Sequence, residues 1–266
     1  MDVGAGCATL RERAGGRLRP GQRPRRCLRI NLKQQCLEGE GTMAHDEDYL
    51  EQLEESASIS ADDMRRLEHL ACKGDVDERY RVAAICANCF ETKEQARRAE
   101  RTLLRLLKDQ DKMVRVNACD SLCQSSSLRV AWRLLGLLAD EEPLLRGYAA
   151  ISLADVSRKR SKCARRICRH VIACRYEKEC DPWVQVCFDG ACYALCDKVR
   201  LKGIVEKLTH RDHEVRYMAL QVMAEEADLE DSSIRHILRQ AAEKETEPYI
   251  RQRYENLLNV PHGGEE

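Results

Sequence analysis

A short pattern recurs six times along this chain: an acidic residue, two variable residues, an apolar residue and then, in all copies but one, arginine. The first residues of successive copies lie 34, 31, 39, 31 and 35 positions apart. Periods of this length are typical of repeat arrays, in which each unit buries its apolar face only against its neighbours. The copies begin at Asp77, Asp111, Glu142, Asp181, Asp212 and Glu247.

Each copy has the features of a helix N-terminus. An Asp at the N-cap can accept hydrogen bonds from the unpaired N–H groups of the first turn, and either carboxylate favours the positive end of the helix dipole. Pro143, Pro182 and Pro248 directly follow three of the acids. This is the first helical position, where proline costs nothing because its missing N–H has no partner there.

Apolar residues after each start repeat at helical spacing, as at Val114, Ala118 and Leu122. Such a stripe predicts a helix with one buried face, and leucine-rich segments before each start predict a second helix. No run alternates with period two. The sequence therefore predicts an all-α superhelix, or solenoid, of about six antiparallel helix pairs over 61–259, which the SADD stretch at 60–63 opens with a capping box.

The flanking segments have a different composition. Residues 1–42 carry nine Lys or Arg and four Asp or Glu, so residues 43–266 are net acidic by five charges. The purine-rich codons that EGEGT at 38–42 requires resemble a bacterial ribosome-binding site before Met43, so we expect Met43 to be the natural start. We expect 1–42 and the tail 260–266 to be disordered, and 43–60 to form an N-terminal cap segment.

The fourth unit departs from the pattern. It is the longest, it has Gln185 in place of arginine, and Asp189 and Gly190 fall inside its second helix. We expect a distorted or extended helix at this point.

The D-x-x-V-R-x-x-A-x-x-x-L units resemble HEAT repeats, particularly the short bacterial kind grouped with phycobilisome lyases, over about 200 residues and all six units. The resemblance implies that the second helix of each pair lines a concave face. It also implies a structural ladder of acids and arginines between neighbouring units, broken at Gln185. The ladder residues would be Asp77, Arg81, Asp111, Arg115, Glu142, Arg146, Asp181, Asp212, Arg216, Glu247 and Arg251.

A basic stretch at 158–175 contains no acid. Lys162, Arg165, Arg166 and Arg169 share one helix face by their spacing. This patch is either a docking site for an acidic partner or nucleic acid, or a solvated outer face. The net acidic array argues against general nucleic-acid binding, and the lack of a long apolar run argues against a membrane span.

Cysteine is abundant, with fifteen residues, seven of them within 163–196. The chain has no export signal, so we expect a cytoplasmic protein with reduced thiols. Many cysteines replace small apolar residues of sister repeats, which predicts core packing. No cofactor is expected, and Cys168, His170 and Cys174 are weak candidates for a metal site because a structural site needs four such ligands.

Catalysis is the less favoured interpretation. Two irons bound as in the deoxyhypusine hydroxylase type of HEAT-repeat enzyme need several His-Glu pairs, and only His213-Glu214 occurs. Nothing identifies the bilin site of a lyase, and aromatic residues are too scattered for a HEAT-like DNA glycosylase. A lyase or metal-dependent enzyme with its site at the fourth unit remains the alternative.

The sequence thus predicts a non-catalytic scaffold that binds another protein on its concave face and has no small-molecule substrate. Positions chosen to lie opposite the buried stripe give the predicted partner-binding set. These residues are Asp120, Tyr148, Ser152, Tyr217, Gln221 and Asn256.

Overall fold

The computed structural model describes residues 44–56 and 58–259. Within these ranges the chain is helical and has no strand, which confirms the predicted all-α class. The predictions for 1–42, Met43 and 260–266 lie outside the described residues. The helices are α1 (Ala44–Glu55), α2 (Ala61–Lys73), α3 (Val76–Cys86), α4 (Lys93–Leu106), α5 (Lys112–Ser121), α6 (Leu128–Leu137), α7 (Pro143–Arg158), α8 (Lys162–Tyr176), α9 (Pro182–Ala194), α10 (Leu201–Lys207), α11 (His213–Glu226), α12 (Ser232–Lys244) and α13 (Pro248–Leu258), with short 3₁₀ turns η2 (Leu122–Gln124) and η3 (Lys198–Arg200).

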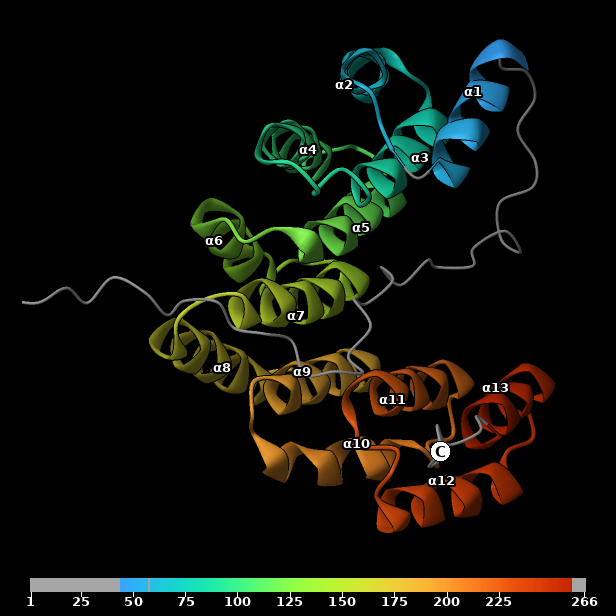
Figure 1. Ribbon diagram of the computed structural model, residues 1–266. Coiled ribbons are helices and arrows are strands. Elements are labelled where there is room, and N and C mark those ends of the chain that lie inside the picture. The colour runs from blue at the N-terminus through green and yellow to red at the C-terminus, as the bar shows by residue number, and fades with distance from the viewer. Residues whose placement is uncertain (1–43, 57, 260–266) are drawn as a thin grey trace, which may run out of the picture.

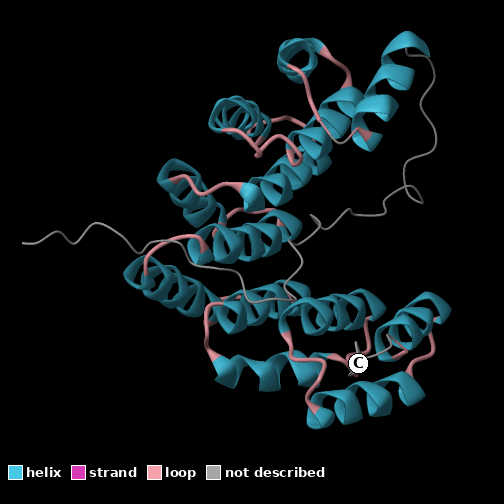
Figure 2. Cartoon of the chain, in the orientation of Figure 1, coloured by secondary structure: helices cyan, strands magenta, loops and turns pink. Residues whose placement is uncertain are grey.

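The helices form two rows (Figures 1 and 2). Each odd-numbered helix from α3 to α11 packs on the next odd-numbered helix, and we call α3, α5, α7, α9, α11 and α13 the inner row. Each even-numbered helix from α2 to α12 packs against the odd-numbered helix that follows it, and these helices form the outer row. Figure 1 shows the inner row curving, with the outer row on its convex side.

Side chains cap the helix starts largely as the sequence predicts. Ser60 and Asp63 form the expected capping box of α2. The carboxylates of Asp111, Asp181 and Asp212 accept hydrogen bonds from the first turns of α5, α9 and α11. These bonds satisfy N–H groups that have no partner inside the helix.

The repeat alignment is two residues out of register in the first copy, although Asp77 does lie at the start of α3, as expected for an N-cap or first-turn acid. Asp75, not Asp77, is the N-cap of α3, and its carboxylate and that of Glu78 form a capping box. Asp77 lies in the first turn, and Arg79 occupies the fourth helical position that Arg115 occupies in α5. Asp75 and Asp77 each precede an arginine by four residues here, so the local pattern admits both registers.

The arginine at the fourth position fixes the start of its own helix. Arg115 Nη1 donates to the carbonyls of Asp109 and Gln110, at 2.9 Å each. Arg146 and Arg216 bind the matching carbonyls of their own loops, and Gln185 Nε2 still reaches the carbonyl of Glu179 at 2.8 Å. The repeated arginine therefore joins each helix to the preceding loop by hydrogen bonds.

Three of these arginines also bind the next unit, through an acid that the sequence pattern did not single out. Arg216 Nε and Nη2 donate to both carboxylate oxygens of Glu245, at 2.9 and 2.7 Å. Arg79 binds Asp109 and Arg146 binds Glu179 in the same bidentate way. Each acid lies two residues before the next N-cap residue and also accepts its backbone N–H.

The predicted ladder is thus wrong in its acids and in its continuity. Arg115 and Arg251 bind loop carbonyls in place of an acid, and Arg81 pairs with Glu54 of α1 at 2.8 Å. The bidentate arginine–acid pairs occur at every second junction between repeat units. At the junction that follows Gln185, His210 occupies the position that an acid has at the other junctions. Its Nδ1 accepts a hydrogen bond from the backbone N–H of Asp212.

Glycines allow the central helices of the inner row to approach closely. A Cβ on Gly147 of α7 would collide with the ring of Trp183 and lie 2.9 Å from Cys187 Sγ, both on α9. A Cβ on Gly190 of α9 would lie 2.7 Å from a methyl of Val222 on α11. These close approaches hold α7, α9 and α11 as the tightest part of the row.

No helix within the described ranges is both long enough and apolar enough to cross a bilayer.

Replacing Arg216 with Gln keeps a donor for the loop carbonyls, as Gln185 does, but leaves the buried Glu245 carboxylate without its partner. We expect a loss of about 3 kcal/mol in the free energy of unfolding by urea. Arg251→Gln is the matched control, because Arg251 binds a carbonyl only, and it should change stability far less. Equal losses in the two variants would contradict the role assigned to the bidentate pair.

Gly147→Ala should destabilise the protein by about 1–3 kcal/mol, because the added methyl forces the Trp183 ring to move. Gly136 of α6 provides the control, since a Cβ there meets nothing within 4 Å. Gly136→Ala should stabilise by about 0.5–1 kcal/mol through helix propensity alone. Thermal unfolding of the two variants measures both effects, and equal signs would be inconsistent with the packing described.

Candidate functional site on the inner row

Aromatic side chains line the inner row from α7 to α13. The rings of Tyr148 and Trp183 lie 5.7 Å apart between α7 and α9, and those of Tyr217 and Tyr249 lie 5.7 Å apart between α11 and α13. Trp183 and Tyr217 are half-buried, and Tyr249 is 49% exposed. Partly exposed aromatic rings held by their neighbours are the residues that protein interfaces use most.

A polar chain runs beside these rings. The Gln221 amide donates to Glu225, and its oxygen accepts from Arg253 of α13. The Arg253 guanidinium also lies 5.4 Å from the centre of the Tyr217 ring, a cation–π arrangement. These contacts fix the orientation of Tyr217 and Arg253 before any partner arrives.

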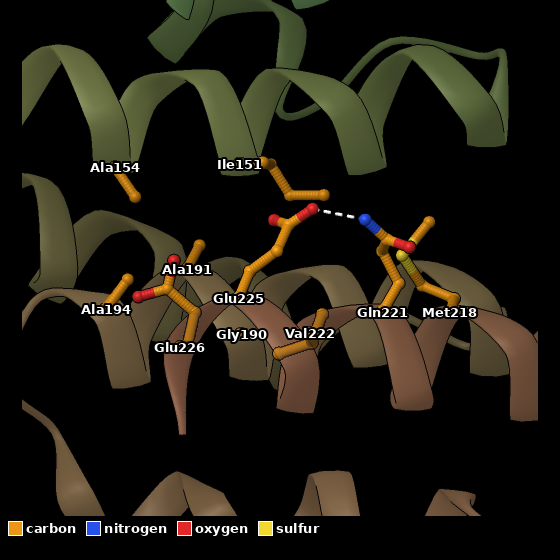
Figure 3. A pocket seen from close by; sticks show the side chains of 10 residues that line it. All are labelled: Ile151, Ala154, Gly190, Ala191, Ala194, Met218, Gln221, Val222, Glu225 and Glu226. Carbon is orange, nitrogen blue, oxygen red and sulfur yellow. Dashed lines mark hydrogen bonds between the residues drawn. The ribbon is translucent and has the colours of Figure 1, made fainter. Parts of the chain in front are cut away.

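Small side chains leave a shallow hollow between α7, α9 and α11 (Figure 3). Ile151 and Ala154 of α7 point across it toward α11, and Gly190 and Ala194 of α9 form part of its wall. The rest of the lining is Ala191, Met218, Gln221, Val222, Glu225 and Glu226. The hollow is therefore apolar within, with two carboxylates among its lining residues.

The carboxylates along this stretch have partners within the chain. Asp155 and Glu226 both bind Arg158, which joins α7 to α11. Glu225 accepts a hydrogen bond from Gln221, and the buried Asp120 lies close enough to Tyr148 to raise the pKa of that phenol, second to its burial. The surface of the inner row is therefore mainly aromatic here, with Glu225 as a partly exposed acid.

Four of the six predicted partner-binding residues do not face solvent. Asp120, Tyr148, Ser152 and Gln221 are buried, so their choice as solvent-facing positions was wrong. Tyr217 is half-buried, and Asn256 is exposed and accepts a hydrogen bond from Gln252. The reason is the close approach of neighbouring inner helices, which covers positions that would be open on an isolated helix pair. Partner binding by these residues stays a prediction.

The structure brings Tyr148, Tyr217 and Gln221 together with residues that the sequence analysis did not select. Trp183 and Tyr249 both occupy the second position of their helices, two residues before the fourth-position residue. That common offset from the repeat pattern is the signal that could have found them. Arg253 and Glu225 offered no such signal, because they join the site through contacts between helices.

The predicted basic patch lies on α8 in the outer row, away from the inner row (Figure 1). Lys162 and Arg166 are exposed, whereas Arg165 and Arg169 are partly buried. The preceding basic residues serve a different purpose. Lys159 Nζ and Arg160 Nη1 donate to backbone carbonyls of Gln124 and Ser126, at 2.6 Å each.

The weak metal candidates do not converge. Cys168 is buried, while the exposed His170 and Cys174 form a pair one helical turn apart, with 3.7 Å between Nε2 and Sγ. In the part of the chain that the structure describes, no three His, Cys, Asp or Glu side chains are grouped to hold a metal. Burial raises the pKa of the Cys119 and Cys187 thiols, in keeping with cysteines that pack as small apolar residues.

The fourth unit is regular where distortion was expected. α9 runs unbroken from Pro182 to Ala194 through Asp189 and Gly190. The irregular residue follows the helix, since Cys196 has a φ of 75°. A helix that ends with a residue in the left-handed conformation can satisfy its last carbonyls, and here Asp197 N–H donates to the carbonyl of Cys192.

Asp189 is a buried carboxyl that the sequence analysis did not assign a role. Arg200 Nη1 lies 3.3 Å from its Oδ1, and the Arg200 guanidinium lies 4.7 Å from the centre of the Tyr176 ring. Gly203 of α10 leaves room for the carboxylate, because a Cβ there would collide with Oδ2. Burial raises the pKa of Asp189 to about 6, although Arg200, Tyr176 and Lys207 act to lower it.

Comparisons with known proteins leave the family open. No family model matches this chain, and no curated protein matches it. The resemblance to HEAT repeats therefore stays a prediction from the repeat pattern, and the function is argued from the residues of the inner row.

Asp189 should make stability depend on pH. Its folded-state pKa of about 6 lies above its ordinary value of 3.8, so the folded protein binds the proton more tightly and loses stability as pH rises through this range. Asp189→Asn cannot titrate. The stability of the wild type relative to this variant should fall by about 1.4 kcal/mol per pH unit between about pH 4 and 6. Urea unfolding across this range measures the difference, and a constant difference would contradict the raised pKa.

Proposed function

We propose that this chain is a HEAT-like solenoid of six helix pairs, and that it binds a partner protein along its inner row without catalysing a reaction. The recurring fourth-position arginine and the packing of successive inner helices support a repeat array. In such arrays each unit adds to one continuous surface, so a long partner segment can contact several units at once.

The single observation that carries the proposal is the aromatic surface from α7 to α13. Trp183, Tyr217 and Tyr249 supply rings that lose little conformational entropy on binding, because neighbouring side chains already fix them. The hollow between α7, α9 and α11, with a volume of about 10 Å³, has room for about one water-sized group only, so the rings provide the contact surface. Preorganisation of this kind lowers the cost of association.

The chemistry of the surface indicates the chemistry of the partner. Asp155 and Glu226 pair with Arg158, whereas the partly exposed Glu225 accepts a hydrogen bond from the neutral Gln221 amide, and a carboxylate can accept further hydrogen bonds. A partner segment with lysine or arginine among apolar residues would place its cation at Glu225 and be attracted to it at low salt.

The proposal places the protein in the cytoplasm and needs neither a cofactor nor a small-molecule substrate. Five of the cysteines in the described ranges are exposed and unbridged, which fits a compartment that keeps thiols reduced. They are Cys72, Cys163, Cys174, Cys180 and Cys196.

Photo-crosslinking in cells tests the proposal. Benzoylphenylalanine at position 217 or 249 should give the same specific adduct, whereas the label at the 82% exposed Val199 should not. With the purified partner, Tyr249→Ser and Glu225→Lys should each weaken affinity by about tenfold or more, as expected for anchors in an interface, and Val199→Ser should not. Adducts only from position 199, or an affinity indifferent to both changes, would contradict the assignment.

A further inference from the structure

The outer faces of α6 and α8 carry a concentration of exposed apolar side chains. Leu128 and Trp132 on α6 are 53% and 67% exposed, and Ile167 on α8 is 55% exposed. In the described part of the chain the other large apolar side chains with comparable exposure are single residues on α3, η3 and α13. Scattered apolar residues are normal on a surface, but a group shared by neighbouring helices marks an interaction site.

α6 has two apolar faces. Val130, Ala131 and Leu134 are buried against the array, which accounts for the stability of the helix. Leu128, Trp132 and Gly136 form a second line at four-residue spacing on the exposed side, and Gly136 has open space above it. An outer-row helix needs only one apolar face, so the second line is unexplained by the fold.

The two helices begin side by side. Arg160 Nη1, in the loop before α8, donates to the carbonyl of Ser126, in the loop before α6, at 2.6 Å. Lys159 Nζ donates to the carbonyls of Cys123 and Gln124 and so also connects the start of α8 to the segment before α6. Figure 1 shows α6 and α8 as successive helices of the outer row. The starts of α6 and α8 are therefore held together, and a helix laid across them can contact exposed apolar side chains of both.

The surroundings of the apolar line are basic. Neither α6 nor α8 contains an acidic residue. No ion pair within the described ranges involves the basic residues of this face, in contrast to the paired Arg146 and Arg216 of the inner row. These basic residues are Arg129, Arg133, Lys162, Arg165, Arg166 and Arg169.

The array already binds a helix of complementary character elsewhere. α1, with the sequence AHDEDYLEQLEE, has six acids and no Lys or Arg. It buries Leu50 and Leu53 and packs against α3, and its Glu54 pairs with Arg81 at 2.8 Å. An acidic amphipathic helix is thus a type of ligand that these repeats accommodate.

We propose that the exposed apolar and basic side chains of α6 and α8, a site separate from the inner row, bind an acidic amphipathic helix of a partner protein. Leucine-type side chains of that helix cover Leu128, Trp132 and Ile167, and its flanking carboxylates pair with Arg129 and Arg166. Apolar anchors at helical spacing with charges beside them are the pattern of helix-in-groove recognition. A phosphate backbone would satisfy the arginines but leave the two aliphatic side chains in water.

The test uses the full chain and two synthetic helical peptides labelled with fluorescein. Both carry Leu at helical spacing, one with Glu and the other with Lys at the remaining charged positions. Fluorescence anisotropy should show saturable binding of the Glu peptide, and the Lys peptide should leave the exposed Trp132 accessible to acrylamide. Protection of Trp132 from acrylamide quenching should accompany binding, measured in a Trp183→Phe background because the chain has two tryptophans.

Variants separate this site from a general charge effect. The affinity for the Glu peptide should fall by about tenfold or more in the double variant Arg129→Glu and Arg166→Glu. The single variant Trp132→Ser should lower it by a similar factor. The matched controls are Arg239→Glu with Lys244→Glu on α12, and Val199→Ser on η3, which are also exposed and should leave affinity unchanged. Arg129, Trp132, Arg166 and the control residues are all exposed, so far-ultraviolet circular dichroism of these variants should show unchanged folding, and the Trp183→Phe background is checked separately because Trp183 is half-buried.

Three outcomes would overturn the proposal. The first is no binding of the Glu peptide, or equal protection of Trp132 by the Lys peptide. The second is binding that survives both test variants. The third is binding of phosphatidylserine vesicles or of single-stranded RNA that the two arginine changes abolish while the Glu peptide fails to compete, which would assign the face to lipid or nucleic acid. The inner-row crosslinking result does not depend on any of these.

Discussion

The position of each inner-row helix depends on hydrogen bonds between a side chain at its start and the loop that precedes it. The fourth residue of the helix, arginine or Gln185, binds backbone carbonyls of the preceding loop. That loop connects an outer-row helix to the inner-row helix and so sets where the inner-row helix begins. At every second junction an acid in the next loop binds the arginine from the other side and also caps its own helix. Burial would raise the pKa of Glu179 and Glu245, yet the bonds from Arg146 and Arg216 lower it, so these carboxylates stay charged.

With the helix starts fixed, small residues decide how closely the helices approach. Gly147 and Gly190 let α7, α9 and α11 approach closely, and the rings of Tyr148 and Trp183 meet across the α7–α9 contact. On the outer row, α6 and α8 keep exposed apolar side chains. The inner surface is mainly aromatic and the α6–α8 surface is basic and apolar, so the two would select partners of different chemistry.

Sequence reasoning succeeded where a pattern is local and failed where it depends on neighbours. The capping box at Ser60 and the caps at Asp111, Asp181 and Asp212 follow from residues within one turn. The register of the first copy was ambiguous because Asp75 and Asp77 both precede an arginine at the right distance. Solvent exposure of Asp120 and Gln221 was misjudged because burial there comes from adjacent repeats, which a single unit does not contain.

The sequence by itself determined the helical class, most helix starts and the period of the repeat, because caps, prolines and apolar stripes act over a few residues. Only the tertiary structure decided which acid each arginine binds, because Arg216 and Glu245 are 29 residues apart and nothing in the local pattern links them. It also decided the surfaces: the burial of Tyr148 and the exposure of Trp132 depend on how closely neighbouring helices pack, a property of the whole array.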